Sequence, residues 1–132
     1  MSLITIPIAV GELIDKITIL EIKTERINDQ QKLENINNEL TRLNDTRNTS
    51  SLASVDIAEQ QRQLKTVNET LWDIEDEIRA KEYRGEFDEH FIELARSVYI
   101  NNDKRAALKR EINELTGSEL VEEKSYFDYR RT

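Results

Sequence analysis

The stretch 11-GELIDKITILEIKTERI-27 decides the fold, because its apolar residues return at the spacing of an α-helix. Intervals of four, three, four and three residues separate Leu13, Ile17, Leu20, Thr24 and Ile27. Such spacing places these side chains on one face of an amphipathic helix. The protein is therefore expected to be built from helices that bury one stripe each.

The same pattern resumes at Leu33, but it is displaced around the helix by residues 28–30. We predict one helix of about 35 residues with a local correction of phase, and a break at Asn28 is the alternative. The segment 44–54, NDTRNTSSLAS, predicts a loop, because Asn, Ser and Thr side chains hydrogen-bond their own backbone.

Two further amphipathic helices follow this loop. The second is expected to begin with an Asp56 cap and to end at Gly85, and the third carries apolar residues from Phe87 to Leu115 and ends at Gly117. Short turns make neighbouring helices antiparallel. We predict an all-α protein of three long antiparallel helices, forming a bundle or coiled-coil-like fold with a short extended N-terminal arm and a C-terminal tail.

Composition narrows the possible functions. The 132 residues fit a single helical domain spanning 1–132, and they carry 19 Lys and Arg against 27 Asp and Glu, a net charge of −8. This acidic balance disfavours binding to nucleic acid or to anionic membrane surfaces. Cysteine is absent, so disulfides and thiol chemistry are excluded. We expect an acidic cytoplasmic protein.

Both ends of the chain are candidates for self-association. Residues 3–10 are largely apolar and are expected to form an extended arm or an edge strand ended by Pro7, and the tail contains the aromatic residues Tyr126, Phe127 and Tyr129. A slim bundle buries such residues poorly by itself, and large exposed apolar patches mark interaction sites. We therefore expect the protein to form a homo-oligomer, most simply a dimer.

An acidic cluster is the first candidate for chemistry. All-helical nucleotide pyrophosphohydrolases hold magnesium with carboxylates from two helices, and this chain has an E-x-x-D on its first helix but lacks their paired E-x-x-E. The favoured interpretation is an exposed acidic face beside Trp72, with no metal. The residues of this candidate cluster are Glu12, Asp15, Glu69, Asp73 and Asp76.

A polar layer is the second candidate. If three long helices run up, down and up, polar residues interrupt the stripes of the first and third helices at the same height. We predict that Arg105 pairs with a carboxylate of the first helix, preferably Glu34, with Glu39 one turn away as the alternative. The residues of the predicted layer are Gln31, Glu34, Asn101 and Arg105.

Two resemblances bear on function. Residues 11–26 are similar to the first helix of the helical chorismate mutases, although the arginine which that family places before the aspartate would fall at Ile8. The segments 6–27, 71–79 and 91–129 together resemble an uncharacterised family of small helical proteins from bacteria and phages. That resemblance implies a one-domain fold and no particular activity.

The sequence favours a helical interaction or scaffold protein of unknown partner that associates with itself. Long three-helix bundles offer extended faces over a slim core. The alternative is a small all-α enzyme, similar either to the magnesium-dependent nucleotide pyrophosphohydrolases or to the chorismate mutases. No cofactor is expected.

Overall fold

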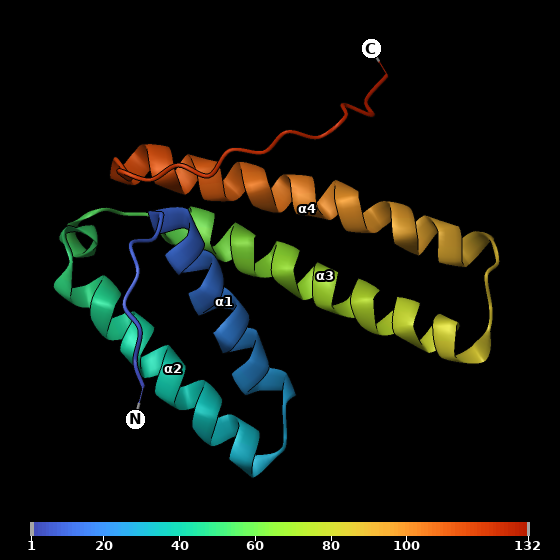
Figure 1. Cartoon of the computed structure of the whole chain (residues 1–132), viewed down its shortest axis with the longest axis horizontal. Coiled ribbons are helices and arrows are strands. Elements are labelled where there is room, and N and C mark those ends of the chain that lie inside the picture. The colour runs from blue at the N-terminus through green and yellow to red at the C-terminus, as the bar shows by residue number, and fades with distance from the viewer. Residues whose placement is uncertain (1, 132) are drawn as a thin grey trace.

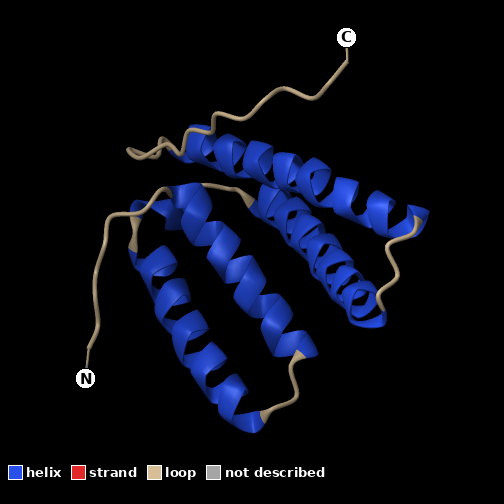
Figure 2. Ribbon diagram, turned by 45° about the vertical axis from the view of Figure 1, so that its right-hand side comes forward, coloured by secondary structure: helices blue, strands red, loops and turns tan. Residues whose placement is uncertain are grey.

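The computed structural model describes residues 2–131, and in this range it contains helices and no strand (Figures 1 and 2). The expectation of an all-α fold is confirmed, but four α-helices and one short 3-10 helix take the place of three long helices. The elements are α1 Val10–Arg26, α2 Gln30–Thr49, η1 Ser51–Ser54, α3 Ala58–Arg84 and α4 Glu89–Thr116.

The prediction of one continuous first helix is wrong, and the alternative of a break at Asn28 is correct. Ile27 leaves the helical conformation with φ −95° and ψ 132°, and Asp29 caps α2 by accepting a hydrogen bond from the Lys32 amide at 2.9 Å. The displaced apolar stripe therefore marks a reversal of the chain, which folds α2 back against α1. Helix α2 also continues to Thr49, so most of the predicted loop at 44–54 is helical.

Helices α3 and α4 form a second hairpin, with boundaries close to those predicted. Gly85 ends α3 with φ +67°, a left-handed conformation that glycine adopts without a Cβ penalty. Asp88 begins α4 by accepting from the Phe91 amide, and its carboxylate also lies 2.9 Å from the Lys81 ammonium. The tip of this hairpin is thus fastened by charge as well as by backbone geometry.

Helix α1 lies between α2 and the α3–α4 hairpin and contributes more buried apolar residues than any other helix. It packs against α2, α3 and α4, whereas the main contacts of α2 are with α1 and η1 (Figure 2). This position explains why α1 buries a wide apolar face while charged residues such as Lys16 and Glu25 remain exposed. Its fully or nearly fully buried apolar residues are Leu13, Ile14, Ile17, Leu20 and Ile22.

The N-terminal end of α1 touches the backbone of α4. A Cβ atom at Gly11 would stand 2.3 Å from the carbonyl oxygen of Lys109, so only glycine fits there. The Gly11 amide donates to Asn113 Oδ1 at 2.7 Å, and the Val10 amide donates to Ser118 Oγ at 3.1 Å. These contacts supply partners for amides that a helix start leaves without any.

The segment preceding α1 is extended, as predicted, and pairs with no strand within residues 2–131. Its outer residues Leu3, Ile4 and Ile6 are exposed, whereas Ile8 packs against the core. Within the described residues, no helix combines the length and apolar character needed to cross a membrane.

Replacement of Gly11 by alanine is expected to lower the free energy of unfolding by about 3 kcal/mol, because the new methyl group meets backbone that cannot rotate away. Gly85→Ala is the matched control: it has open space around it, and its left-handed conformation alone should cost about 1 kcal/mol. Urea denaturation followed by circular dichroism compares the two variants. Equal losses of unfolding free energy in the two variants would show that Gly11 does not lie close to the Lys109 backbone in solution.

Candidate functional site

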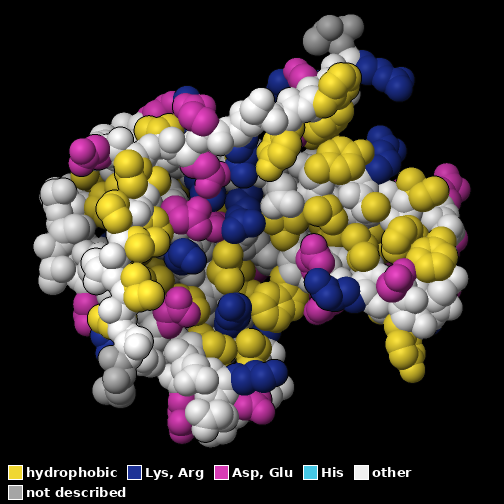
Figure 3. Space-filling view, viewed as in Figure 1, with side chains coloured by type: hydrophobic (Ala, Val, Ile, Leu, Met, Phe, Trp, Pro, Cys, Tyr) yellow, Lys and Arg dark blue, Asp and Glu magenta, His cyan; other side chains and the backbone are white. Residues whose placement is uncertain are grey.

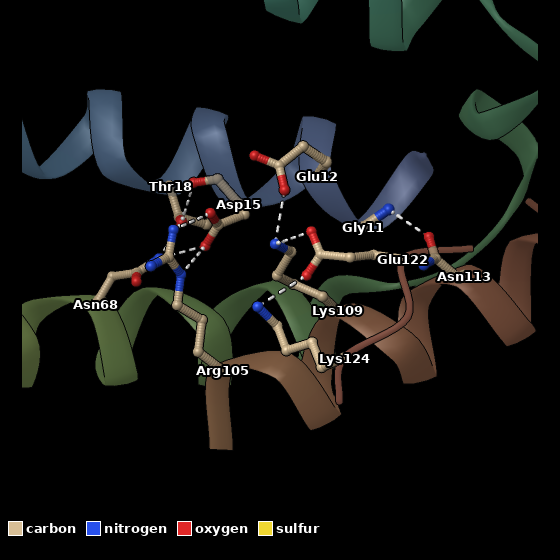
Figure 4. A network of polar contacts seen from close by, with 10 residues as sticks. All are labelled: Gly11, Glu12, Asp15, Thr18, Asn68, Arg105, Lys109, Asn113, Glu122 and Lys124. Carbon is tan, nitrogen blue, oxygen red and sulfur yellow. Dashed lines mark hydrogen bonds and ion pairs between the residues drawn. The ribbon is translucent and has the colours of Figure 1, made fainter. Parts of the chain in front are cut away.

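Asp15 is a buried carboxylate at the centre of the molecule. Its side chain is 1% exposed, and the Arg105 guanidinium from α4 binds both of its oxygens, with Nε 2.9 Å from Oδ1 and Nη2 2.5 Å from Oδ2 (Figure 4). From α3, the Asn68 side-chain amide donates to Asp15 Oδ1 at 2.9 Å and to Thr18 Oγ1 at 3.0 Å. Three helices therefore meet at one carboxylate.

This cluster satisfies the electrostatic demands of burial. The hydrogen bonds to Asp15 raise the pKa of Arg105 above its usual value, against the opposing effect of partial burial. Among residues 2–131, every buried side-chain nitrogen and oxygen has a hydrogen-bond partner. Charge-assisted, bidentate pairs of this kind fix geometry as well as charge, so the cluster sets how α1 lies against α3 and α4.

A second set of ion pairs lies one turn further along α4. The ammonium group of Lys109 is 2.6 Å from Glu12 of α1 and 3.5 Å from Glu122 of the C-terminal tail. Glu122 also lies 3.2 Å from Lys124, and the hydrogen bond from Lys124 is the main cause that lowers the pKa of Glu122. Figure 4 shows Lys109 and Lys124 both directed at this one carboxylate.

Residues 118–129 of the tail run back along α4 and contact it at two places. Glu123 pairs with Arg110 at 3.3 Å, and further on the Tyr129 hydroxyl donates to Asp103 at 2.5 Å. The Tyr129 ring also meets Tyr99 edge to face, with ring centroids 4.9 Å apart. The hydrogen bond to Asp103 raises the pKa of Tyr129.

Two hollows adjoin the cluster. The larger, of about 950 Å³, lies between α4 and the tail, and we call it the tail groove. The smaller, of about 420 Å³, lies between α1, α3 and α4 beside Trp72. Asn102 and Arg105 line both hollows, so the guanidinium that holds Asp15 also borders each open space.

The predicted polar layer is only partly present. Arg105 does pair with a carboxylate from the first predicted helix, but that carboxylate is Asp15, and the prediction of Glu34 is wrong. Glu34, Gln31 and the alternative partner Glu39 lie exposed on α2, and Asn101 donates to the carbonyl of Ser97 in its own helix. The error follows from counting heights along a continuous helix, since the break after Ile27 turns α2 away from α4.

The residues of the acidic cluster are dispersed. Asp15 and Glu12 are paired with cations of α4, and Asp73 lies 2.6 Å from Arg26. Asp76 lines the smaller hollow, and Glu69 is half-buried on α3. Within residues 2–131, no three His, Cys, Asp or Glu side chains come together in a group that could hold a metal ion.

The sequence analysis placed Asp15 in a candidate acidic cluster and did not predict its pairing with Arg105, nor the roles of Lys109, Glu122 and Lys124. Asp15 carried a signal, because it lies between Leu13 and Ile17 in a run of buried residues where a lone charge needs a partner. Lys109 also carried one, since it follows Arg105 by four residues and so shares its helix face. Glu122 and Lys124 carried none, because the course of the tail is not encoded in any local pattern.

The fold and site define an all-α protein made of two helical hairpins joined through a buried ion-pair cluster. The chain belongs to the family of unknown function DUF6165, whose family model matches residues 4–131. No curated protein and no solved structure matches it.

Replacement of Asp15 by alanine is expected to lower the free energy of unfolding by about 3 kcal/mol, because it leaves the guanidinium of Arg105 without its buried partner. Asp73→Ala is the control: its pair with Arg26 is solvent-exposed and should contribute less than about 1 kcal/mol. Glu34→Ala should change stability by less than about 0.5 kcal/mol, since Glu34 lies on the surface. Denaturant titration measures the free energy of unfolding of each variant. A larger loss for Glu34→Ala than for Asp15→Ala would contradict the Asp15–Arg105 pair and support a pair between Glu34 and Arg105.

Proposed function

We propose that this protein is a helical interaction protein that associates with a second copy of itself. The observation that carries the proposal is its large surface. The chain exposes 9493 Å². A compact monomer of 15.5 kDa is expected to expose about 7,200 Å². The excess of about 2,300 Å² exceeds the roughly 800 Å² that each partner contributes to a standard interface.

The arm and the tail contribute to the uncovered surface, and so does the α3–α4 hairpin. With 27 and 28 residues these helices extend about 40 Å, whereas α1 has 17 residues and extends about 26 Å. The last turn of α1 reaches only the middle of α3, where Arg26 meets Asp73. Beyond that point α3 and α4 pack on each other alone (Figure 1).

This projecting half of the hairpin carries apolar side chains in contact with water. Tyr83, Phe87 and Ile92 are exposed, with Phe87 at 61% and Ile92 at 55%. The Phe87 and Phe91 rings pack edge to face, with centroids 5.2 Å apart, and extend the apolar surface around the tip. Figure 3 shows hydrophobic side chains gathered over this half of the molecule and over the neighbouring tail.

A second copy is the occupant that fits this surface best. Two antiparallel helices form half of a four-helix bundle, and the same hairpin from another copy, related by a two-fold axis, completes it. Such an arrangement buries the same patch twice and closes without leaving a new free face. The N-terminal arm also exposes apolar residues, but as an extended segment it loses more conformational entropy on docking than a preformed hairpin does.

Sedimentation equilibrium at high micromolar concentration is expected to give twice the chain mass of 15.5 kDa. The double replacement Phe87→Ser, Ile92→Ser should shift the protein to a monomer while its helical circular dichroism stays unchanged, because both side chains lie on the surface.

The matched control is Leu115→Ser, Leu120→Ser, which removes two exposed apolar side chains at the other end of α4 and beyond it. It should leave the dimer intact. A strictly monomeric wild type would reject the proposal, and so would dissociation by Leu3→Ser, Ile4→Ser, Ile6→Ser with no effect of the hairpin variant.

A further inference from the structure

The tail groove has two chemically different ends. At the end nearer the start of the tail, the wall of the groove is cationic and is formed by Arg105, Lys109 and Lys124. At the other end its wall is aromatic, formed by Tyr99, Phe127 and Tyr129. Lys109 and Asp103, which binds Tyr129, are six residues apart on α4, so the two ends are separated by about 9 Å along the helix axis.

The residues that line the groove include more cations than carboxylates, in contrast to the chain as a whole. Four cations and two carboxylates line the groove, although Asp and Glu outnumber Lys and Arg by 27 to 19 in the chain. Both lining carboxylates already have partners: Asp103 accepts from the Tyr129 hydroxyl, and Asp128 accepts from Arg130 at 2.9 Å. The three cations at the other end also have carboxylate partners: Arg105 pairs with Asp15, Lys109 with Glu12 and Glu122, and Lys124 with Glu122. A further anion therefore has to take the place of Glu122, the one partner that comes from the tail.

These three cations retain donors for a further acceptor. Arg105 uses Nε and one N–H of Nη2 on Asp15, and a guanidinium has five N–H groups in all. Lys124 contacts Glu122 at 3.2 Å with one of its three N–H groups. The Glu122 carboxylate itself lies between Lys109 and Lys124 and is 43% exposed. The position between Lys109 and Lys124, at the edge of the tail groove, therefore accepts an anion. The carboxylate that occupies it belongs to the exposed tail.

The aromatic end offers unburied ring surface beside these cations. Phe127 is 91% exposed and lines this end of the groove. Tyr126, which is 77% exposed, also lines the groove, with the Lys124 ammonium 5.7 Å from its ring centroid. Aromatic faces of this kind bind planar rings by offset or edge-to-face packing. The volume of about 950 Å³ is within the range of small-molecule sites.

We propose that the tail groove binds a small ligand in which an anionic group, phosphate or carboxylate, is joined to a planar ring, as in a nucleoside monophosphate. The anionic group replaces the carboxylate of Glu122 between Lys109 and Lys124 and accepts from the free N–H groups of Arg105. The ring packs among Tyr99, Phe127 and Tyr129. Glu122 thus competes with the ligand for the same two ammonium groups.

Isothermal titration calorimetry with adenosine monophosphate tests the proposal. Inorganic phosphate and adenosine, the two parts of this ligand, are titrated separately for comparison. The monophosphate should bind more tightly than either part. Lys124→Ala should weaken its binding about tenfold, through loss of a charge-assisted hydrogen bond. Phe127→Ser should weaken it about fivefold, through loss of ring packing. Lys104→Ala, an exposed lysine of α4 outside the groove, is the control for charge and should have no effect.

Glu122→Gln gives the sharpest test, because the expected effect is tighter binding. Removal of the competing carboxylate should raise the affinity for adenosine monophosphate severalfold. Glu123→Gln is the control, because it weakens the attachment of the tail by removing the neighbouring carboxylate and its pair with Arg110. This variant should not raise the affinity for adenosine monophosphate. Absence of binding, equal affinity for phosphate alone, or unchanged affinity in both Glu122→Gln and Lys124→Ala would overturn the proposal.

Discussion

The buried pair between Asp15 and Arg105 is the interaction on which the rest of the structure depends. A carboxylate removed from water is destabilising unless its partners replace the lost hydration, and here Arg105 and Asn68 supply those partners from two different helices. Because the geometry of a bidentate pair is narrow, it fixes the rotation of α1 and its height against α4. The close backbone contact at Gly11 and the Lys109–Glu12 pair then follow within one turn of the same helices.

The sequence predicted the helices well where one periodic stripe continued and was closed by a recognisable end signal. The boundary at Gly85 and the pairing of Arg105 with a carboxylate of the first helical segment are examples. The prediction from the sequence failed at residues 27–29. A displaced apolar stripe is compatible both with a phase correction in one helix and with a reversal of the chain between two helices. The wrong partner, Glu34, followed from that single error. The tail groove was beyond prediction, since it depends on contacts between Tyr129 and Asp103 that are far apart in sequence.

Arg105 connects the stability of the fold to the open side of the molecule. One part of its guanidinium holds the buried Asp15, and its side chain, 30% exposed, borders the tail groove. The neighbouring Lys109 has the same double position, since it contacts Glu12 on α1 and Glu122 on the tail. The core and the groove therefore share their charged residues, so an anion in the groove would act directly on the contacts that join α1 to α4.

The unequal packing of the helices has a consequence for local motion. Helix α1 is held by three neighbours, whereas α2 is held chiefly by α1 and η1. In the part of the chain that the structure describes, helix α2 makes no hydrogen bond to Asp15, Asn68 or Arg105, and it packs chiefly on one helix through residues such as Ile36 and Leu40. We therefore expect α2 to open more readily than α1. The amide protons of α2 should exchange with solvent through this partial opening, while those of α1 near Asp15 exchange only when the whole chain unfolds.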